Sequence, residues 1–305
     1  MKGLAIGSCF VENIGGWLLK VKFNLQTNPF GITYNPISIS KQLTLLSNME
    51  TYPEAQLFLH NEFWQSFDHH SRFSGMNKNT VLSTINKSFL AAKTQLNNVN
   101  YLLITFGTAN IYTHKKSNQV VSNCHKLPNN EFSKKRLTVK EIMAAWEPIL
   151  QKFSDMPPLV NIIFTVSPVR HLRDGILENQ RSKATLLLAI DNLVTKFDNC
   201  HYFPAYEIVI DDLRDYRFYD KDMIHPNEVA IDYIKEKFAA TYFDENCKSI
   251  VDEIVAVQNA VGHKAFWPES EGHKAFVRQT LEKIEGLVDK YGFDFEEEVE
   301  SLCLE

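Results

Sequence analysis

The sequence predicts an α/β fold of three layers, with helices on both faces of a mostly parallel, doubly wound sheet. Two observations lead to this fold class. Residues 101–106 (YLLITF) and 159–166 (LVNIIFTV) are continuous apolar runs of the length typical of strands that are buried on both faces. Segments with helical periodicity separate these runs, as in sheets whose parallel strands are joined by helices.

The remaining elements follow in the order that this fold requires. Residues 4–6 form a short apolar strand ended by a glycine, and residues 12–20 have helical spacing. Residues 28–31 (NPFG) have the composition of a loop, and Ser38 is expected to cap a helix over 38–46. The other expected elements are helices at 80–96, 139–153, 184–197 and 226–242, a short strand at 201–203, an ordered aromatic loop at 63–73 and a polar excursion at 114–133.

The pattern changes after residue 243, where only helical periodicity remains. We expect helices at roughly 247–260 and 274–290, followed by the acidic run 296–298. The chain is therefore expected to divide into an α/β domain at 1–243 and a helical extension at 244–305. This extension is expected either to cover the site as a lid or to hold two copies together as a homodimer.

Composition and charge limit the classes of protein to be considered. The 305 residues carry a net charge of −5 and a pI of about 6.1, which argues against nucleic acid as a partner. The sequence has no apolar run of about 18 residues, and its first residues do not resemble a signal peptide, so no membrane association is expected. Five widely scattered cysteines favour reduced thiols in a cytoplasmic protein over a disulfide framework.

Three side chains at predicted loop positions have the chemistry of an acyl-transfer site. Open α/β sheets place their sites at the carboxyl ends of the strands. Ser8 follows the first strand, and Asp222 and His225 lie just before the last helix of the α/β domain. We predict that Ser8 is the nucleophile, that His225 is its base and that Asp222 orients the base.

Two alternatives exist for these residues. Cys9 is a rival nucleophile, and since neighbouring residues leave a strand in opposite directions, only one of Ser8 and Cys9 is expected to face His225. In a purely structural interpretation, Ser8 caps the following helix, while Asp222 and His225 belong to a turn and a helix start.

Polar residues on the intervening loops are candidates for substrate binding, and the arginines among them suit an anionic or sugar-like group. They are His69, His70, Arg72, Asn123, His125, Arg170 and His171. The spacing of the histidines fits no standard zinc pattern, so neither a metal nor another cofactor is predicted.

Several segments together resemble one known family. They are GSCF at 7–10, ENIG at 12–15, NPFGITYNP at 28–36, FGT at 106–108, VVSNCHKLP at 120–128, TVSPVRH at 165–171 and DMIHPN at 222–227. Over roughly residues 1–245 the chain resembles the GSCFA-domain family, which is itself similar to the SGNH (GDSL-type) hydrolases. The resemblance implies their flavodoxin-like fold. It also matches Ser8 to the nucleophile, in preference to Cys9.

The resemblance further implies how the remaining blocks are used. Asp222 and His225 match the closing block of the triad, and Gly31 matches a glycine whose N–H stabilises the oxyanion beside that of Ser8. The third block departs from the pattern, because its asparagine, Asn110, comes one place late and should leave the strand end on the other face. We therefore expect the oxyanion donors among Ser8, Gly31, Thr108 and Asn110, with Asn123 as a substitute.

The resemblance implies a serine esterase that needs no cofactor. Its substrate is expected to be a small or glycan-derived ester, with acetyl as the acyl group. Two alternatives remain open. One is an O-acyltransferase with the same triad, and the other is a non-catalytic carbohydrate- or nucleotide-binding protein, which the displaced Asn110 would suit.

Overall fold

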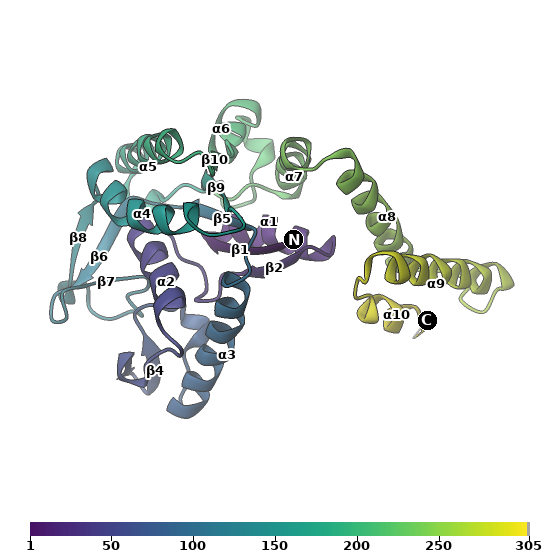
Figure 1. Cartoon of the computed structure of the whole chain (residues 1–305), viewed down its shortest axis with the longest axis horizontal. Coiled ribbons are helices and arrows are strands. Elements are labelled where there is room, and N and C mark those ends of the chain that lie inside the picture. The colour runs from purple at the N-terminus through teal and green to yellow at the C-terminus, as the bar shows by residue number, and fades with distance from the viewer. Residues whose placement is uncertain (304–305) are drawn as a thin grey trace. The chain divides into compact units, whose positions relative to one another are not determined.

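The computed structural model describes residues 1–303 of the chain (Figure 1). The strands are β1 (Lys2–Gly7), β2 (Asn24–Thr27), β3 (Leu57–His60), β4 (Phe63–Ser66), β5 (Tyr101–Phe106), β6 (Asn110–His114), β7 (Gln119–Val121), β8 (Phe132–Arg136), β9 (Asn161–Val166) and β10 (Cys200–Tyr202). The α-helices are α1 (Cys9–Lys20), α2 (Pro36–Asn48), α3 (Lys78–Leu96), α4 (Val139–Ser154), α5 (Ile176–Lys196), α6 (Ala205–Glu207), α7 (Glu228–Tyr242), α8 (Glu245–Val261), α9 (Glu271–Tyr291) and α10 (Glu296–Cys303).

A parallel sheet forms the centre of the fold and confirms the predicted α/β class. Within residues 1–303 its strand order is β10-β9-β5-β1-β2, and every neighbouring pair is parallel. The chain runs from β1 to β2 on one side and then returns to β5 on the other side of β1. The winding direction therefore reverses between β1 and β5, which is where open α/β sheets bind their ligands.

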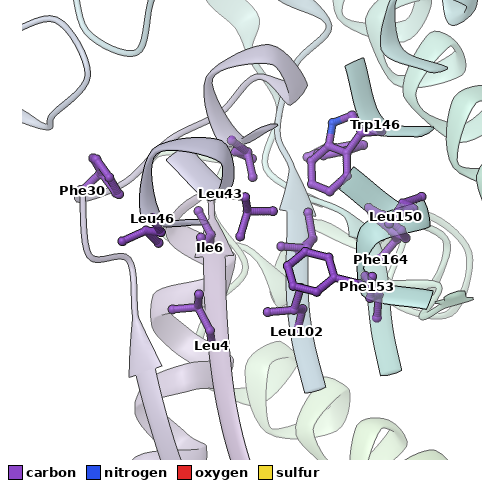
Figure 2. Close-up of a cluster of buried hydrophobic side chains, with 14 of the residues drawn as sticks. Leu4, Ile6, Phe30, Leu43, Leu46, Leu102, Trp146, Leu150, Phe153 and Phe164 are labelled. Atoms are coloured by element: carbon purple, nitrogen blue, oxygen red, sulfur yellow. The ribbon is translucent and has the colours of Figure 1, made fainter. Parts of the chain in front are cut away.

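Both faces of the sheet are buried. On one face Leu4 of β1 lies in a cluster with Leu43 of α2 and Trp146 of α4, and the helix side chains point onto the strands (Figure 2). Ala5, the next residue of β1, is 0% exposed but lies outside this cluster. Because successive side chains of a strand point to opposite faces, the second face must be covered as well. α1 covers part of it, since a Cβ on Gly15 would lie 2.6 Å from a methyl group of β2.

Several local predictions differ from the structure. α2 begins at Pro36, and Asn35 caps it by accepting the N–H of Ser38 at 2.8 Å, so Ser38 is not the cap. The expected loop at 63–73 contains β4, which pairs with β3. The polar excursion at 114–133 contains β7 and connects β6 to β8, and these three strands form the antiparallel sheet β7-β6-β8. β2 is an additional strand in which only Leu25 is buried. Such short and half-exposed strands lack the continuous apolar run that identifies a buried parallel strand.

The chain forms two compact units. The first comprises Met1–Trp17 and Asn24–Lys235, and the second comprises Leu18–Phe23 and the residues from Glu236 onward. The second unit has its own apolar core, in which Ile254 of α8, Ile284 of α9 and Leu302 of α10 pack together. All candidate site residues lie in the first unit. None of the helices within residues 1–303 combines the length and apolarity needed to cross a membrane.

Candidate active site

Ser8 lies at the turn between β1 and α1. Gly7 before it packs so closely against β5 that a Cβ there would lie 2.4 Å from the carbonyl oxygen of Thr105. The Ser8 carbonyl accepts the N–H of Val11 at 2.9 Å, and Oγ accepts the N–H of Phe10 at 3.3 Å. Ser8 therefore caps α1, as the structural interpretation expects. Because Oγ acts as acceptor in that bond, the hydroxyl proton stays available for donation.

Asp222 and His225 form a hydrogen-bonded pair on the loop before α7. Nδ1 of His225 lies 2.5 Å from Oδ2 of Asp222, and Oδ1 accepts the N–H groups of Ile224 and His225 at 2.8 and 3.0 Å. The backbone and ring N–H groups of His225, followed by that of Ile224, lower the pKa of Asp222 to about 2. An ionised carboxylate can only accept, so Nδ1 carries the proton and Nε2 is left as the basic nitrogen.

Ser8 is not hydrogen-bonded to this pair within the described residues. Within residues 1–303 no hydrogen bond joins Oγ of Ser8 to His225, whose side chain is 47% exposed. Hydrogen bonds between catalytic groups are often long before substrate binds. For the predicted proton transfer, the hydroxyl of Ser8 and Nε2 of His225 would therefore have to come closer together.

His171 lies between the end of β5 and the Asp222–His225 pair. Its Nε2 is 3.3 Å from the position that a Cβ on Gly107 would take, and its ring meets that of Tyr34 edge-on with 5.3 Å between centroids. Burial lowers the pKa of His171 to about 4, and the charges of Lys183 and His225 contribute. His171 is therefore neutral at physiological pH and remains a candidate for substrate contact.

Lys183 of α5 is buried beneath the same edge of the sheet. It is 1% exposed, and its Nζ donates to the carbonyl oxygens of Gly107 at 2.7 Å and Ser167 at 2.6 Å. These two residues directly follow β5 and β9. Burial lowers the pKa of the ammonium group to about 7. A single side chain thus ties two strand ends together.

The side chains expected to stabilise an oxyanion from the third block have other partners. Thr108 Oγ1 lies 3.0 Å from the hydroxyl of Ser182, and the backbone N–H of Thr108 donates to the carbonyl oxygen of Tyr34 at 3.0 Å. Nδ2 of Asn110 donates to Oδ2 of Asp174 at 3.0 Å. The expected role of Thr108 and Asn110 is therefore corrected, because both stabilise the start of β6 instead.

Gly31 also differs from its expected role. Its N–H donates to the carbonyl oxygen of Asn28 at 2.8 Å and closes a turn, so it is not free to bind an oxyanion. Its glycine identity has another reason, since φ is +80° and a Cβ would lie 2.3 Å from Cβ of His70. The N–H of Ser8, by contrast, has no backbone acceptor among the described residues.

His70 and Arg72 lie beside this turn and reach the surface. Nη2 of Arg72 donates to the carbonyl oxygen of Asn28 at 2.7 Å, and Nη1 lies 3.4 Å from Glu12. Burial and the charge of Arg72 lower the pKa of His70. Arg72 also lines a hollow of about 290 Å³ together with residues 73–77 and part of α3. Both side chains remain candidates for substrate binding.

His69 and His125 lie in the interior, which corrects the expectation that they bind substrate. His69 is 1% exposed, with Nδ1 2.9 Å from the hydroxyl of Ser66, and burial lowers its pKa to about 3. Nε2 of His125 lies 2.7 Å from the Ser66 carbonyl oxygen, and Asn123 accepts the N–H of His125 at 2.8 Å. His69, His125 and Asn123 therefore stabilise the loops around β4.

Arg170 and Cys9 complete the surroundings of the candidate triad. The guanidinium of Arg170 lies 4.7 Å from the ring centroid of Tyr219 and reaches the loop that carries Asp222 and His225. Burial and the nearby carboxylate of Glu12 raise the pKa of the Cys9 thiol. A thiol with a raised pKa is a poor nucleophile at neutral pH, which favours Ser8.

Asn28 is a buried residue that the sequence does not single out. It is 1% exposed, and its Oδ1 accepts the N–H of Gly7 at 2.9 Å. The only signal was an asparagine in a predicted turn directly after the first βα unit. No three histidine, cysteine, aspartate or glutamate side chains are gathered as a metal site in the part of the chain that the structure describes.

Two family models match this chain. The model of the GSCFA family matches residues 2–238, and the model of the C-terminal domain of GSCFA domain proteins matches residues 254–303. A comparison with curated proteins found no match. The first model covers most of the chain, including every residue of the site described above. The chain therefore belongs to the GSCFA family.

Proposed function

We propose that this protein is a serine esterase in which Ser8 attacks the acyl carbonyl, His225 takes the hydroxyl proton and Asp222 orients His225. The observation that carries the proposal is the Asp222–His225 pair, with 2.5 Å between Oδ2 and Nδ1. Two further N–H groups hold the carboxylate in place, which is the support that an orienting residue needs. The reversal of the sheet between β1 and β5 supports a site at this edge.

The proposed substrate is an acetyl ester of a small or sugar-like alcohol. Arg72 is exposed beside the Ser8 turn, and Tyr216 is 56% exposed near Arg170. A planar cation and an exposed aromatic ring are groups that bind the hydroxyls and the face of a sugar. The free cysteines among the described residues are compatible with the cytoplasmic location that we also propose.

The experiment compares Ser8→Ala with Cys9→Ala as its matched neighbour. Wild-type protein is expected to hydrolyse p-nitrophenyl acetate and to react with a fluorophosphonate probe at Ser8. Ser8→Ala should abolish labelling and reduce kcat by at least about 10³-fold, whereas Cys9→Ala should keep both. Undiminished labelling of Ser8→Ala would refute the assignment. A rate that depends on an added alcohol acceptor would identify an O-acyltransferase instead.

A second candidate is a binding protein that retains the fold without catalysis. The missing hydrogen bond between Ser8 and His225 and the use of Ser8 as a helix cap favour it. This candidate predicts that acetylated sugars bind without release of acetate and that no probe labels Ser8. Isothermal titration with an acetylated sugar, followed by an acetate assay on the same sample, separates it from the esterase.

A further inference from the structure

Asn28 is fixed in place from three directions. It directly follows β2, and its N–H donates to the carbonyl oxygen of Ala5 in β1 at 2.8 Å. Its own carbonyl oxygen accepts the N–H of Gly31 at 2.8 Å and Nη2 of Arg72 at 2.7 Å. The residue adopts φ = +40°, a conformation that asparagine tolerates better than most residues. The position of its side chain is therefore set by the backbone of two strands and a charged partner.

The two polar atoms of the Asn28 side chain differ in their hydrogen bonds. Oδ1 accepts the N–H of Gly7 at 2.9 Å, which fixes the amide one residue before Ser8. Nδ2 is buried and has no hydrogen-bond partner among the described residues. Buried amide donors are rarely left unpaired, and an unpaired one in a native site needs an explanation. Nδ2 lies on the same planar group as Oδ1, so this unused donor is within a few ångströms of the nucleophile turn.

We propose that Nδ2 of Asn28 is the side-chain donor of the oxyanion hole and that it acts together with the N–H of Ser8. This role rests on the proposed esterase function. It supplies the donor that Asn110 does not provide, since the amide of Asn110 is bonded to Asp174. Because the bond from Gly7 prevents rotation of the Asn28 amide, the donor is oriented before substrate arrives, as electrostatic stabilisation of a transition state requires.

In the proposed esterase, acylation begins with attack by Ser8. Oγ of Ser8 forms a bond to the acyl carbon while its proton moves to Nε2 of His225, and the carbonyl π electrons move onto the carbonyl oxygen. That oxyanion accepts hydrogen bonds from Nδ2 of Asn28 and from the N–H of Ser8. When the carbonyl re-forms, the bond to the leaving alcohol breaks and His225 returns the proton to the alkoxide oxygen. Water repeats the sequence on the acyl-enzyme.

The variant Asn28→Asp tests this role. Aspartate keeps the acceptor for Gly7 and loses the donor, so kcat for p-nitrophenyl acetate should fall by about 10²–10³-fold while KM stays within about twofold. The matched control is Asn35→Asp, another buried asparagine whose capping bond to Ser38 an aspartate also makes, and it should keep wild-type kcat. A purely structural role for Asn28 would change the melting temperature or KM without this selective loss of kcat.

A second measurement does not depend on the variant. Wild-type protein is reacted with diethyl p-nitrophenyl phosphate, and the crystal structure of the Ser8 adduct is determined. A phosphoryl oxygen within about 3.2 Å of Nδ2 is expected, and an adduct that turns this oxygen away from Asn28 overturns the proposal. Wild-type kcat in Asn28→Asp also overturns it but leaves the triad intact. Wild-type protein that neither hydrolyses the ester nor reacts at Ser8 refutes the esterase and the Asn28 role together.

Discussion

Nη2 of Arg170 donates a hydrogen bond at 2.8 Å to the carbonyl oxygen of Met223, the residue next to Asp222. Met223 has φ = +61°, a left-handed conformation that is uncommon for residues other than glycine and asparagine. The hydrogen bond from Arg170 therefore stabilises a strained turn, and this turn carries both Asp222 and His225.

Replacing Arg170 with glutamine should lower kcat by about 10- to 100-fold with little change in KM, because the turn would no longer hold Asp222 and His225 in a fixed orientation. A substrate-binding role would raise KM instead. Steady-state kinetics with p-nitrophenyl acetate distinguish the two. Arg173→Gln, in the next turn of the same loop, is the control and should behave as wild type.

Asp222→Asn should reduce kcat by about 10⁴-fold while leaving the melting temperature nearly unchanged, since the pair is solvent-exposed. The asparagine cannot hold His225 in the tautomer with a basic Nε2. Asp220→Asn, two residues earlier on the same loop, is the matched control. Equal activity of the two variants would show that Asp222 has no orienting role.

Gly7→Ala should destabilise the first unit by about 3 kcal/mol, because its Cβ would lie 2.4 Å from a backbone oxygen of β5. Gly16 of α1 offers the contrast, since a Cβ there meets nothing within 4 Å. Gly16→Ala should stabilise the helix by up to about 1 kcal/mol. Urea denaturation measures both, and a Gly7→Ala protein as stable as wild type would contradict the packing argument.

Stability should fall on acidification below pH 6.5. His69 and His171 have folded-state pKa values lowered from 6.5 to about 3 and about 4, so the unfolded chain binds more protons than the folded one in this range. Their contribution is complete above pH 6.5 and is lost as the pH falls toward 4. Melting temperatures between pH 7.5 and 4.5 test this. His69→Gln should melt lower at pH 7.5 but show a shallower pH slope, and an unchanged slope would exclude His69 as a cause.

The central strands of the sheet and the Asp222–His225 pair could be predicted from the sequence, because each is encoded by a short stretch of neighbouring residues. Residues 101–106 are apolar throughout and form β5, and the Asp-x-x-His spacing needs only one turn to bring Asp222 to His225. β2 could not be recognised, because it has four residues and only Leu25 is buried.

The hydrogen bonds of the asparagines that bear on the proposed oxyanion hole could not be predicted, because each depends on a partner distant in sequence. Asn28 bonds to Gly7 across 21 residues, and Asn110 bonds to Asp174 across 64. Family resemblance identified Gly31 as the important residue of its turn, but the tight turn uses its N–H and the close approach of His70 accounts for its lack of a side chain.

The two hydrogen bonds of Lys183 determine which side of the site can adapt. Nζ of Lys183 holds the residues after β5 and β9 together, so neither residue can shift without carrying the other or leaving a buried N–H donor without an acceptor. In the proposed esterase, the side of the site formed by these two strand ends is therefore expected to stay rigid when substrate binds. The Asp222–His225 pair lies instead on an exposed loop. If motion of this loop brings His225 to Ser8 in the proposed esterase, turnover should be sensitive to solvent viscosity.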